Sequence, residues 1–421
     1  MSKNSSPFQI TVVGGGMITQ IQILPSLYHL QRLGMLGDIS ICALNAAPLK
    51  ILAEDRSLLE SFPGHTFTPY PDFKKADQNE KFPTLFEEVL KKMSKRNIVF
   101  VALPDQLHCD AIKKALEADQ HVITVKPLVL KYKEALEIEK LALAKGLFVG
   151  VEYHKRFDDR ALITRQQYRR GNLGEFKVGQ ALLVEPWYYR NSNFQNWCTC
   201  ENSDMFTYIG CHYVDQLHFI TGMLPVEVSV YGIKDKYPNG RDGYLYTDGR
   251  VIWENGASLN VIDGMGYPNC APGGNAQGLR MYNKGSKDGC LVFHDDQYRG
   301  VKHCYDTMGA AEGEDKYYHE TSPDYLKMVY RGGQGLEPVG YGYRSIESLI
   351  KAVHRVEQPD FDARRKTIKE IDSEGILATP ANSSYNELVI EAGRMSILND
   401  GRPVVIEYGQ QPHVRFKEFK S

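Results

Sequence analysis

Lys126 and His212 are the side chains of this sequence best suited to moving a proton. Lys126 ends an apolar, strand-like run from His121 to Val125, where burial favours the neutral amine that a base requires. His212 and Asp215 stand three positions apart, so on a helix they share one face. Such a base takes the hydroxyl proton when an alcohol is oxidised by hydride transfer. The plain alternatives are a surface lysine at a strand end and a polar helical pair that satisfies the interior.

A glycine turn near the N-terminus could hold a dinucleotide as the hydride acceptor. The β-branched residues 10–13 lead into Gly14, Gly15 and Gly16, and residues 17–30 read as a helix. A tight turn that presents N–H groups at a helix start makes a cradle for a pyrophosphate. We therefore expect the three glycines, Met17 and Ile18 to bind a cofactor, although glycine turns after strands also occur elsewhere.

The elements that must position these residues alternate along the first 125 residues. Strand-like runs at 39–44, 98–103 and 121–125 are separated by helix-like segments that include 84–92 and 110–118. Parallel neighbouring strands need such crossovers. The pattern predicts an α/β fold with a doubly wound parallel Rossmann sheet, and the glycine turn at its first strand.

Asn45 follows the second strand-like run, where an acid normally bonds the adenosine ribose and repels a 2'-phosphate. Its amide oxygen can still accept a ribose hydroxyl, but it carries no charge. We therefore expect NAD, with NADP not excluded. The alternative is a turn residue ahead of Pro48.

Composition limits the class of protein. With 421 residues, 42% of them hydrophobic, the chain predicts two globular domains. A net charge of -2 gives no basic field for nucleic acid or an anionic membrane, and small neutral substrates fit better. No segment reads as a signal peptide or a membrane span, so we expect a cytoplasmic protein. Eight sparse cysteines predict thiols rather than disulfides, and no motif has zinc spacing, so we expect no metal.

Several short motifs follow one another in a fixed order over residues 8–357. They are the glycine turn, Pro104 with His108 four residues on, Lys126-Pro127, Arg156-Phe157, and Gly210-x-His212-x-x-Asp215. In this order they resemble the Gfo/Idh/MocA family of oxidoreductases. The resemblance implies a Rossmann domain followed by an α+β domain, whose open, mostly antiparallel sheet joins copies of the chain into a homodimer or homotetramer.

The resemblance also implies roles for single residues. Lys126 becomes the catalytic centre, with His212 and Asp215 assisting and Pro127 permitting a cis peptide bond. The expected cofactor contacts extend to Leu103, Pro104, His108, Lys126 and Pro127. His154, Arg156, Tyr208, Lys126 and His212 are expected at the substrate.

Three positions depart from the family pattern. Thr19 stands at the third glycine position, so close helix packing must tolerate a β-branched side chain. Val125 replaces the Glu of the family's Glu-Lys-Pro signature, which removes a carboxylate beside the lysine. Tyr208 stands where many family sugar dehydrogenases carry an acid, and its phenol either relays a proton or simply packs.

The second half predicts a substrate domain. Trp187 and Tyr189 belong to an aromatic stretch interleaved with Arg and Asn, as in pockets that stack on sugar rings and read hydroxyls, although core aromatics are the alternative. Strand-like runs at 226–231, 249–253, 257–262 and 290–294 predict the sheet, and the glycine-rich stretch 264–278 predicts a loop.

We expect a Rossmann domain at 1–127 and a substrate-binding and oligomerisation domain at 128–421, of which 358–421 is a C-terminal extension. Within the extension, the basic residues 364–366 and the acidic run up to Glu374 predict a solvated connector. Residues 378–383 predict the capped start of a helix at 384–398.

The combined motifs predict an NAD(P)-dependent oxidoreductase acting on a ring hydroxyl of a sugar, cyclitol or glycoside. One alternative is an NAD-dependent glycosidase that acts by transient oxidation. The other is a dinucleotide-binding regulatory protein without turnover, which Val125 and Tyr208 suggest.

Overall fold

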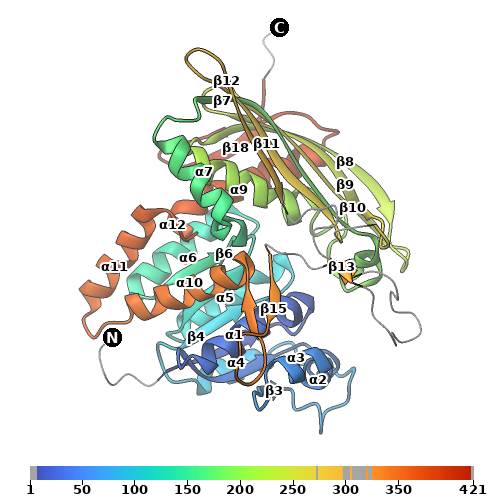
Figure 1. Ribbon diagram of the computed structural model, residues 1–421, viewed down its shortest axis with the longest axis vertical. Coiled ribbons are helices and arrows are strands. Elements are labelled where there is room, and N and C mark those ends of the chain that lie inside the picture. Colours follow the sequence, from blue (N-terminus) through green and yellow to red (C-terminus); the bar gives the residue numbers. More distant parts are fainter. Residues whose placement is uncertain (1–6, 272–273, 297–303, 306–318, 321–324, 419–421) are drawn as a thin grey trace. The chain divides into compact units, whose positions relative to one another are not determined.

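The chain forms two units in the computed structural model (Figure 1). Unit 1 comprises Met1–Phe157 and Met328–Ser384, and unit 2 comprises Asp158–Lys327 and Tyr385–Ser421. The structure describes residues 7–271, 274–296, 304–305, 319–320 and 325–418.

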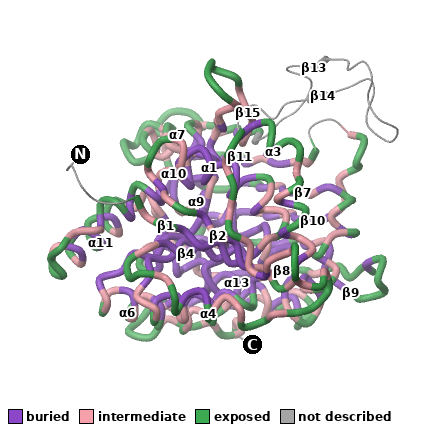
Figure 2. The backbone as a smooth tube through the Cα atoms, turned by 90° about the horizontal axis from the view of Figure 1, so that it is seen from below, coloured by how far each residue is buried: buried purple, intermediate pink, exposed green. Residues whose placement is uncertain are grey.

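A six-stranded parallel sheet forms the centre of unit 1 and confirms the predicted Rossmann fold. Its strands, in spatial order, are β3 (Thr68–Tyr70), β2 (Leu36–Cys42), β1 (Phe8–Val13), β4 (Ile98–Val101), β5 (His121–Val125) and β6 (Val149–Glu152). The strands are apolar because helices cover the sheet; all four residues of β4 are buried (Figure 2).

The helices of unit 1 come from both ends of the sequence. The first part contributes α1 (Leu24–Arg32), α2 (Ala46–Glu54), α3 (Arg56–Ser61), α4 (Leu85–Lys92), α5 (His108–Glu117) and α6 (Tyr132–Lys145). The returning part contributes α10 (Tyr341–Val356), α11 (Phe361–Glu374) and α12 (Pro380–Ser383), preceded by the paired strands β15 (Lys327–Val329) and β16 (Glu337–Val339). Helix α10 packs on α1 and β6.

The structure divides the chain differently from the expected boundary at residue 127. Strand β6 pairs with β5, so the first unit runs on to Phe157. The returning segment covers β6, where the amide of Val151 donates to the carbonyl of Ala378 at 2.9 Å. Covering an edge strand satisfies backbone groups that would otherwise attract other chains. The expected second domain at 128–421 and the extension at 358–421 are therefore shared between the two units.

The predicted connector at 364–374 is wrong, because these residues lie inside helix α11. Arg364 is buried, and its guanidinium donates to the carbonyls of Gly146, Gln358 and Pro359. Residues 378–383 do carry a capping box, formed by Thr379 and Asn382, but it caps the short separate helix α12 and not the helix predicted at 384–398, which begins at Tyr385.

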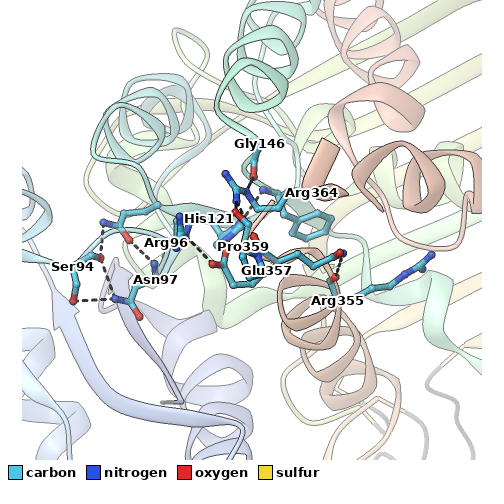
Figure 3. A network of polar contacts seen from close by, with 12 residues as sticks. Ser94, Arg96, Asn97, His121, Gly146, Arg355, Glu357, Pro359 and Arg364 are labelled. Atoms are coloured by element: carbon cyan, nitrogen blue, oxygen red, sulfur yellow. Dashed lines mark hydrogen bonds and ion pairs between the residues drawn. The ribbon is translucent and has the colours of Figure 1, made fainter. Parts of the chain in front are cut away.

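A polar network at the amino-terminal edge of this sheet joins β5 to the end of α10 (Figure 3). Nε2 of His121 lies 3.2 Å from Oε2 of Glu357, and Arg96 pairs with Oε1 of the same carboxylate at 2.7 Å. The amide of Phe148 donates to Nδ1 of His121 at 3.0 Å. His121 thus carries its hydrogen on Nε2, and both ring nitrogens serve the fold.

An eight-stranded sheet forms unit 2 and confirms the predicted open, mostly antiparallel architecture. In spatial order its strands are β12 (Gly289–Asp296), β11 (Ala276–Lys284), β7 (Glu175–Pro186), β10 (Ser258–Tyr267), β9 (Asp242–Trp253), β8 (Pro225–Lys236), β17 (Val404–Glu407) and β18 (His413–Phe416). Only the neighbours β7 and β10 run parallel. The loop expected at 264–278 is shorter, because its ends belong to β10 and β11.

Helices α7 (Asp159–Arg169), α9 (Cys211–Thr221) and α13 (Tyr385–Ile397) complete unit 2, together with the short α8 (Phe194–Trp197) and the small pair β13 (Cys304–Tyr305) and β14 (His319–Glu320). Helix α13 confirms the helix predicted at 384–398. It packs against β8 and α9, which places the last part of the chain beside the predicted catalytic helix.

Candidate active site

The predicted cofactor residues meet at one edge of the sheet in unit 1. All its strands are parallel, so their carboxyl ends lie side by side, and ligands of such sheets bind there. In spatial order this edge carries Asn45 after β2, Gly14 to Gly16 after β1, Leu103 and Pro104 after β4, Lys126 and Pro127 after β5, and His154 after β6.

The glycine turn is shaped for a group that approaches its backbone closely. Gly14 has a φ of +124°, and a Cβ there would lie 2.0 Å from the carbonyl oxygen of Ala102, so only glycine fits. A Cβ on Gly16 would meet nothing within 4 Å, which leaves open space at the start of the helix formed by Met17 and Ile18. This cradle fits a pyrophosphate.

Thr19 does more than fill the third glycine position. Its buried hydroxyl donates to the carbonyl of Gly14 at 2.7 Å, and a π-helical turn, η1 (Thr19–Ile23), begins at this residue. The β-branched side chain therefore braces the glycine turn, and the widened turn makes room for it.

His108 supports the cofactor edge from inside the protein. Its ring is fully buried, with Nδ1 2.8 Å from the carbonyl of Pro127 and Nε2 2.9 Å from that of Leu103. The ring thus links the segments that follow β4 and β5. Both ring nitrogens thus face backbone carbonyls, and a cofactor contact of His108 stays a prediction.

Lys126 lies directly after β5 and is 8% exposed. The Lys126–Pro127 peptide bond is cis, as expected. Val125, where the family pattern has Glu, is the register partner of Glu152 on β6. The neighbouring strand therefore supplies a carboxylate beside the position that lacks one.

Glu152 is a site residue that the sequence reading missed. Its buried Oε1 accepts hydrogen bonds from Nε2 of Gln22 at 2.9 Å and from the hydroxyl of Ser345, while Oε2 lies 3.1 Å from Nδ1 of His154. The imidazole of His154 stacks on Tyr341. An acid ending an apolar strand two residues before a histidine was the available signal.

Arg156 is 2% exposed, and its guanidinium lies over the ring of Tyr153. This packing assigns it to the interior of unit 1. A substrate contact through Arg156 stays a prediction.

In unit 2, a second π-helical turn, η5 (Phe206–Gly210), carries Tyr208 into helix α9. His212 and Asp215 are both buried on this helix. A Cβ on Gly210 would lie 2.6 Å from Oδ2 of the buried Asp263, so the glycine of the motif admits that carboxylate.

Tyr385 of α13 holds the acid of this motif. Its hydroxyl donates to Oδ1 of Asp215 at 2.8 Å, and its ring packs on His218. The following Asn386 donates to the carbonyl of Cys211 at 3.0 Å. No local pattern predicts these contacts, because 170 residues separate Tyr385 from Asp215.

Tyr208 and Tyr189 belong to one aromatic cluster with Phe194 and Trp197. Tyr189 stacks on Phe194, and burial raises the pKa of its phenol well above the usual value. Trp187, in contrast, is 45% exposed, with Arg190 over its ring. Trp187 is thus available for stacking, whereas Tyr189 packs on Phe194, the ring that also contacts Tyr208.

Arg190 itself is committed to the fold. Its buried guanidinium donates to Oδ2 of Asp235 at 2.6 Å, to the hydroxyl of Tyr246 and to the carbonyl of Met265.

Within the described ranges, no group of three or more His, Cys, Asp or Glu side chains could hold a metal ion. Nor is any helix in that part of the chain long and apolar enough to cross a membrane.

Residues 8–153 match the oxidoreductase family with an NAD-binding Rossmann fold. An uncharacterised oxidoreductase of Bacillus subtilis, YfiI, is 30% identical over 175 residues, which are 41% of each chain. The first curated relatives are matched over only 32% to 41% of their own lengths.

Solved structures share the fold of nearly the whole chain. GenD2 from gentamicin A biosynthesis, in complex with NAD, has a TM-score of 0.65 at 15% identity, covering 97% of this chain and 98% of its own. Scyllo-inositol dehydrogenase from Lactobacillus casei, with bound NAD(H) and scyllo-inositol, has a TM-score of 0.59 at 14% identity, covering 95% and 99%.

At such low identity these neighbours show the fold alone, while the family match identifies the domain that carries the glycine turn, His108 and Lys126. Unit 1 is built around an NAD-binding Rossmann fold, and its residues 8–153 match the Gfo/Idh/MocA family of oxidoreductases.

Proposed function

We propose that this protein is an NAD(P)-dependent dehydrogenase that moves a hydride between a ring hydroxyl of a sugar, cyclitol or glycoside and the nicotinamide. The observation that carries the proposal is the buried Lys126 at the same sheet edge as the glycine cradle. A structural neighbour that holds NAD(H) together with scyllo-inositol supports a polyol substrate.

The chain's own residues divide the work. The bound nicotinamide supplies a hydride acceptor or donor. Lys126, which is buried at the end of β5, takes the hydroxyl proton during oxidation. His212 assists the proton transfer, and Asp215, held by Tyr385, orients that histidine from the same helical face. Tyr208 relays a proton from its place in the aromatic cluster.

A neutral substrate suits the side chains that are predicted to contact it. Trp187 offers an exposed aromatic face of the kind that stacks on the C–H face of a sugar ring. Lys126, His154 and His212 supply hydrogen-bonding groups for hydroxyls.

The test is a panel of cyclitols, sugars and glycosides incubated with the purified protein and either NAD or NADP. We expect reduced nicotinamide to accumulate with one substrate class, and Lys126→Ala to lose that activity. Lys133→Ala is the matched control, because Lys133 is exposed on α6 of the same unit. Binding of cofactor without turnover of any substrate would contradict the proposal and favour a regulatory protein. Aglycone release without net reduction would favour a redox-assisted glycosidase.

We propose NAD as the preferred cofactor. Asn45 lies just beyond β2 at the N-cap of α2, without a side-chain capping bond, so its amide oxygen is available to a ribose hydroxyl. Titration of NAD and NADP, repeated with Asn45→Asp, tests this. The carboxylate should weaken NADP binding most, and equal loss of both cofactors would contradict the assignment.

We also propose that copies of this chain associate through the open face of the sheet in unit 2. Val178, Tyr282 and Leu291 are neighbours across β7, β11 and β12, and each is more than half exposed. Such an apolar row is typical of an interface. Light scattering of the protein and of Tyr282→Lys should show an oligomer that the lysine dissociates. A monomeric parent would contradict the proposal.

A further inference from the structure

Trp187 begins the short turn η4 (Trp187–Asn191), which follows β7 in unit 2. The guanidinium carbon of Arg190 lies 3.9 Å from the centroid of its ring and covers one face of the indole. The side chain is nevertheless 45% exposed, whereas Trp253 of the same unit is fully buried. The indole of Trp187 is therefore packed on the protein on one side and open to a ligand on the other.

The guanidinium under the ring is held in one orientation. Its three nitrogens donate to Oδ2 of Asp235 at 2.6 Å, to the hydroxyl of Tyr246 at 2.8 Å and to the carbonyl of Met265 at 2.8 Å. Only 4% of the Arg190 side chain is exposed. A planar fork fixed at three points presents a fixed flat surface, so the indole stacked on it is held in a fixed plane.

The energetics of this arrangement favour a binding role. Burying a cation costs free energy even when the cation is paired, and an indole left in water gains little from the hydrophobic effect. Stability of the fold alone would favour an apolar residue in place of Arg190 and a smaller side chain in place of Trp187. A ring that is preordered at the surface is instead what stacking on a ligand requires.

Continuous packing joins this turn to the helix that carries His212. Tyr189 of the same turn stacks on Phe194, with ring centroids 5.5 Å apart, and Phe194 meets the ring of Tyr208 at 4.8 Å. Tyr208 leads into α9 and His212. Trp187 thus belongs to the part of unit 2 that carries the proposed proton-transfer groups.

An indole face recognises the C–H bonds of a saturated ring. A hydroxyl that points at this face would lose its hydrogen bonds to water and gain no partner. We infer that Trp187 is a stacking platform that selects ring polyols with an uninterrupted C–H face, and that Arg190 and Asp235 are its positioning residues. The inference rests on the proposed function, whose substrate class it narrows.

Two isomeric cyclitols test the selection, because they differ only in what their faces carry. All hydroxyls of scyllo-inositol are equatorial, so both of its faces carry axial hydrogens, whereas D-chiro-inositol has an axial hydroxyl on each face. Calorimetric titration onto the NADH-loaded protein, which cannot oxidise an alcohol, gives the two dissociation constants. We expect scyllo-inositol to bind more tightly, and Trp187→Ala to reduce this preference by about 10-fold. Tyr231→Ala, which removes a 59% exposed ring from β8 of the same unit, is the control and should keep the preference.

The positioning residues are tested by the same ratio of dissociation constants. Arg190→Lys keeps the charge but loses the planar fork, so it should reduce the preference as Trp187→Ala does. Asp235→Asn, at a carboxylate that is 45% exposed, should reduce it by about 3-fold. Asp242→Asn breaks the exposed pair with Lys236 at the same hairpin and is the matched control. A purely structural defect would weaken both cyclitols alike and leave the ratio unchanged.

Fluorine NMR reports the contact itself. With fluorotryptophan in place of the three tryptophans, the signal that Trp187→Phe removes should shift on addition of scyllo-inositol. The inference is overturned if this signal does not move, if the parent binds neither cyclitol or both equally, or if Trp187→Ala keeps the preference. An unchanged ratio in Asp235→Asn and in folded Arg190→Lys would refute the positioning role. Binding of scyllo-inositol at Trp187 without turnover of any polyol would instead contradict the proposed function and leave the stacking platform standing.

Discussion

Two histidine–carboxylate contacts occupy opposite edges of the sheet in unit 1. Glu152 lies 3.1 Å from Nδ1 of His154 at the carboxyl edge, and Glu357 lies 3.2 Å from Nε2 of His121 at the amino edge. The distances are nearly equal. The rings differ in exposure, with 13% of the His154 side chain and none of the His121 side chain open to solvent.

The difference lies in the nitrogen that the carboxylate does not contact. In His121 that nitrogen accepts the amide hydrogen of Phe148, so both ring nitrogens make hydrogen bonds within the fold. In His154 it is Nε2, on a ring that retains access to solvent. The same pair of side chains is thus sealed inside the fold at one edge and partly exposed at the other.

Charges reinforce the contact at the amino edge. Burial lowers the pKa of His121, and this effect exceeds the opposing pull of Glu357. Burial alone would raise the pKa of Glu357, but the hydrogen bond from His121 and the cations Arg96 and Arg364 lower it. A neutral histidine therefore meets an ionised glutamate.

The largest expected effect tests whether the carboxyl edge of the sheet also contributes to the free energy of unfolding. Gly14→Ala should cost about 4 kcal/mol of unfolding free energy and abolish NAD binding, because the new Cβ would collide with the Ala102 carbonyl at a positive φ. Denaturant titration measures the free energy of unfolding. Gly34→Ala is the control, since its φ is also positive but its Cβ has open space. Equal losses in the two variants would show that the collision is relieved.

Next in size is the amino-edge contact. Glu357→Ala should cost about 3 kcal/mol, because it leaves a buried imidazole N–H and Arg96 without their acceptor. NAD affinity of the folded protein should not change. Glu60→Ala, which breaks an exposed pair with Arg56, should alter stability little. Weakened NAD binding in Glu357→Ala would contradict the inference that the amino edge contributes to stability alone.

The pH dependence of stability tests the assignment of His121 and Glu357 to the stability of the amino edge. In the unfolded chain His121 binds a proton below its ordinary pKa of 6.5, whereas in the folded chain its lowered pKa keeps it neutral. Acid therefore favours unfolding, and stability should fall as the pH drops below 6.5. Glu357, lowered from 4.5, adds a further loss below that value. Chemical denaturation across this range should show a smaller decline in His121→Gln, and an unchanged slope would contradict the assignment.

The smallest effect is expected from Ser345→Ala. It removes one of three hydrogen bonds to Glu152 but leaves the contact with His154, so about 1 kcal/mol of stability is lost and kcat/KM changes little. Thermal unfolding with steady-state kinetics measures both. A large fall in kcat/KM would contradict this expectation.

Local patterns were sufficient for much of the fold. Strand β5 matches its predicted range residue for residue, and helix α13 lies within one residue of its prediction at each end. Gly14 and Lys126 could be singled out because their signals, a glycine turn and a lysine ending an apolar strand, are contained in a few neighbouring residues.

What the sequence could not provide depends on contacts between distant segments. The carboxylate beside Val125 required the register of β5 with β6, and its partner Ser345 lies 193 residues away. The charged residues of α11 were predicted as a solvated connector because charged side chains usually lie in solvent. Arg364 is instead buried in unit 1, where its guanidinium donates hydrogen bonds to backbone carbonyls. The boundary at residue 127 was misplaced for the same reason, since strand pairing decides where a sheet ends.

The segment that covers β6 is synthesised long after β6 itself. Strand β6 is complete when Glu152 has been made, but Ser345 follows 193 residues later, after most of unit 2. At about 5 to 20 residues per second, roughly 10 to 40 seconds pass between them. During that interval the ribosome carries a sheet whose outer strand lacks its cover and whose Glu152 lacks Ser345. Each newly made molecule therefore passes through a stage in which this edge is open to the wrong neighbour.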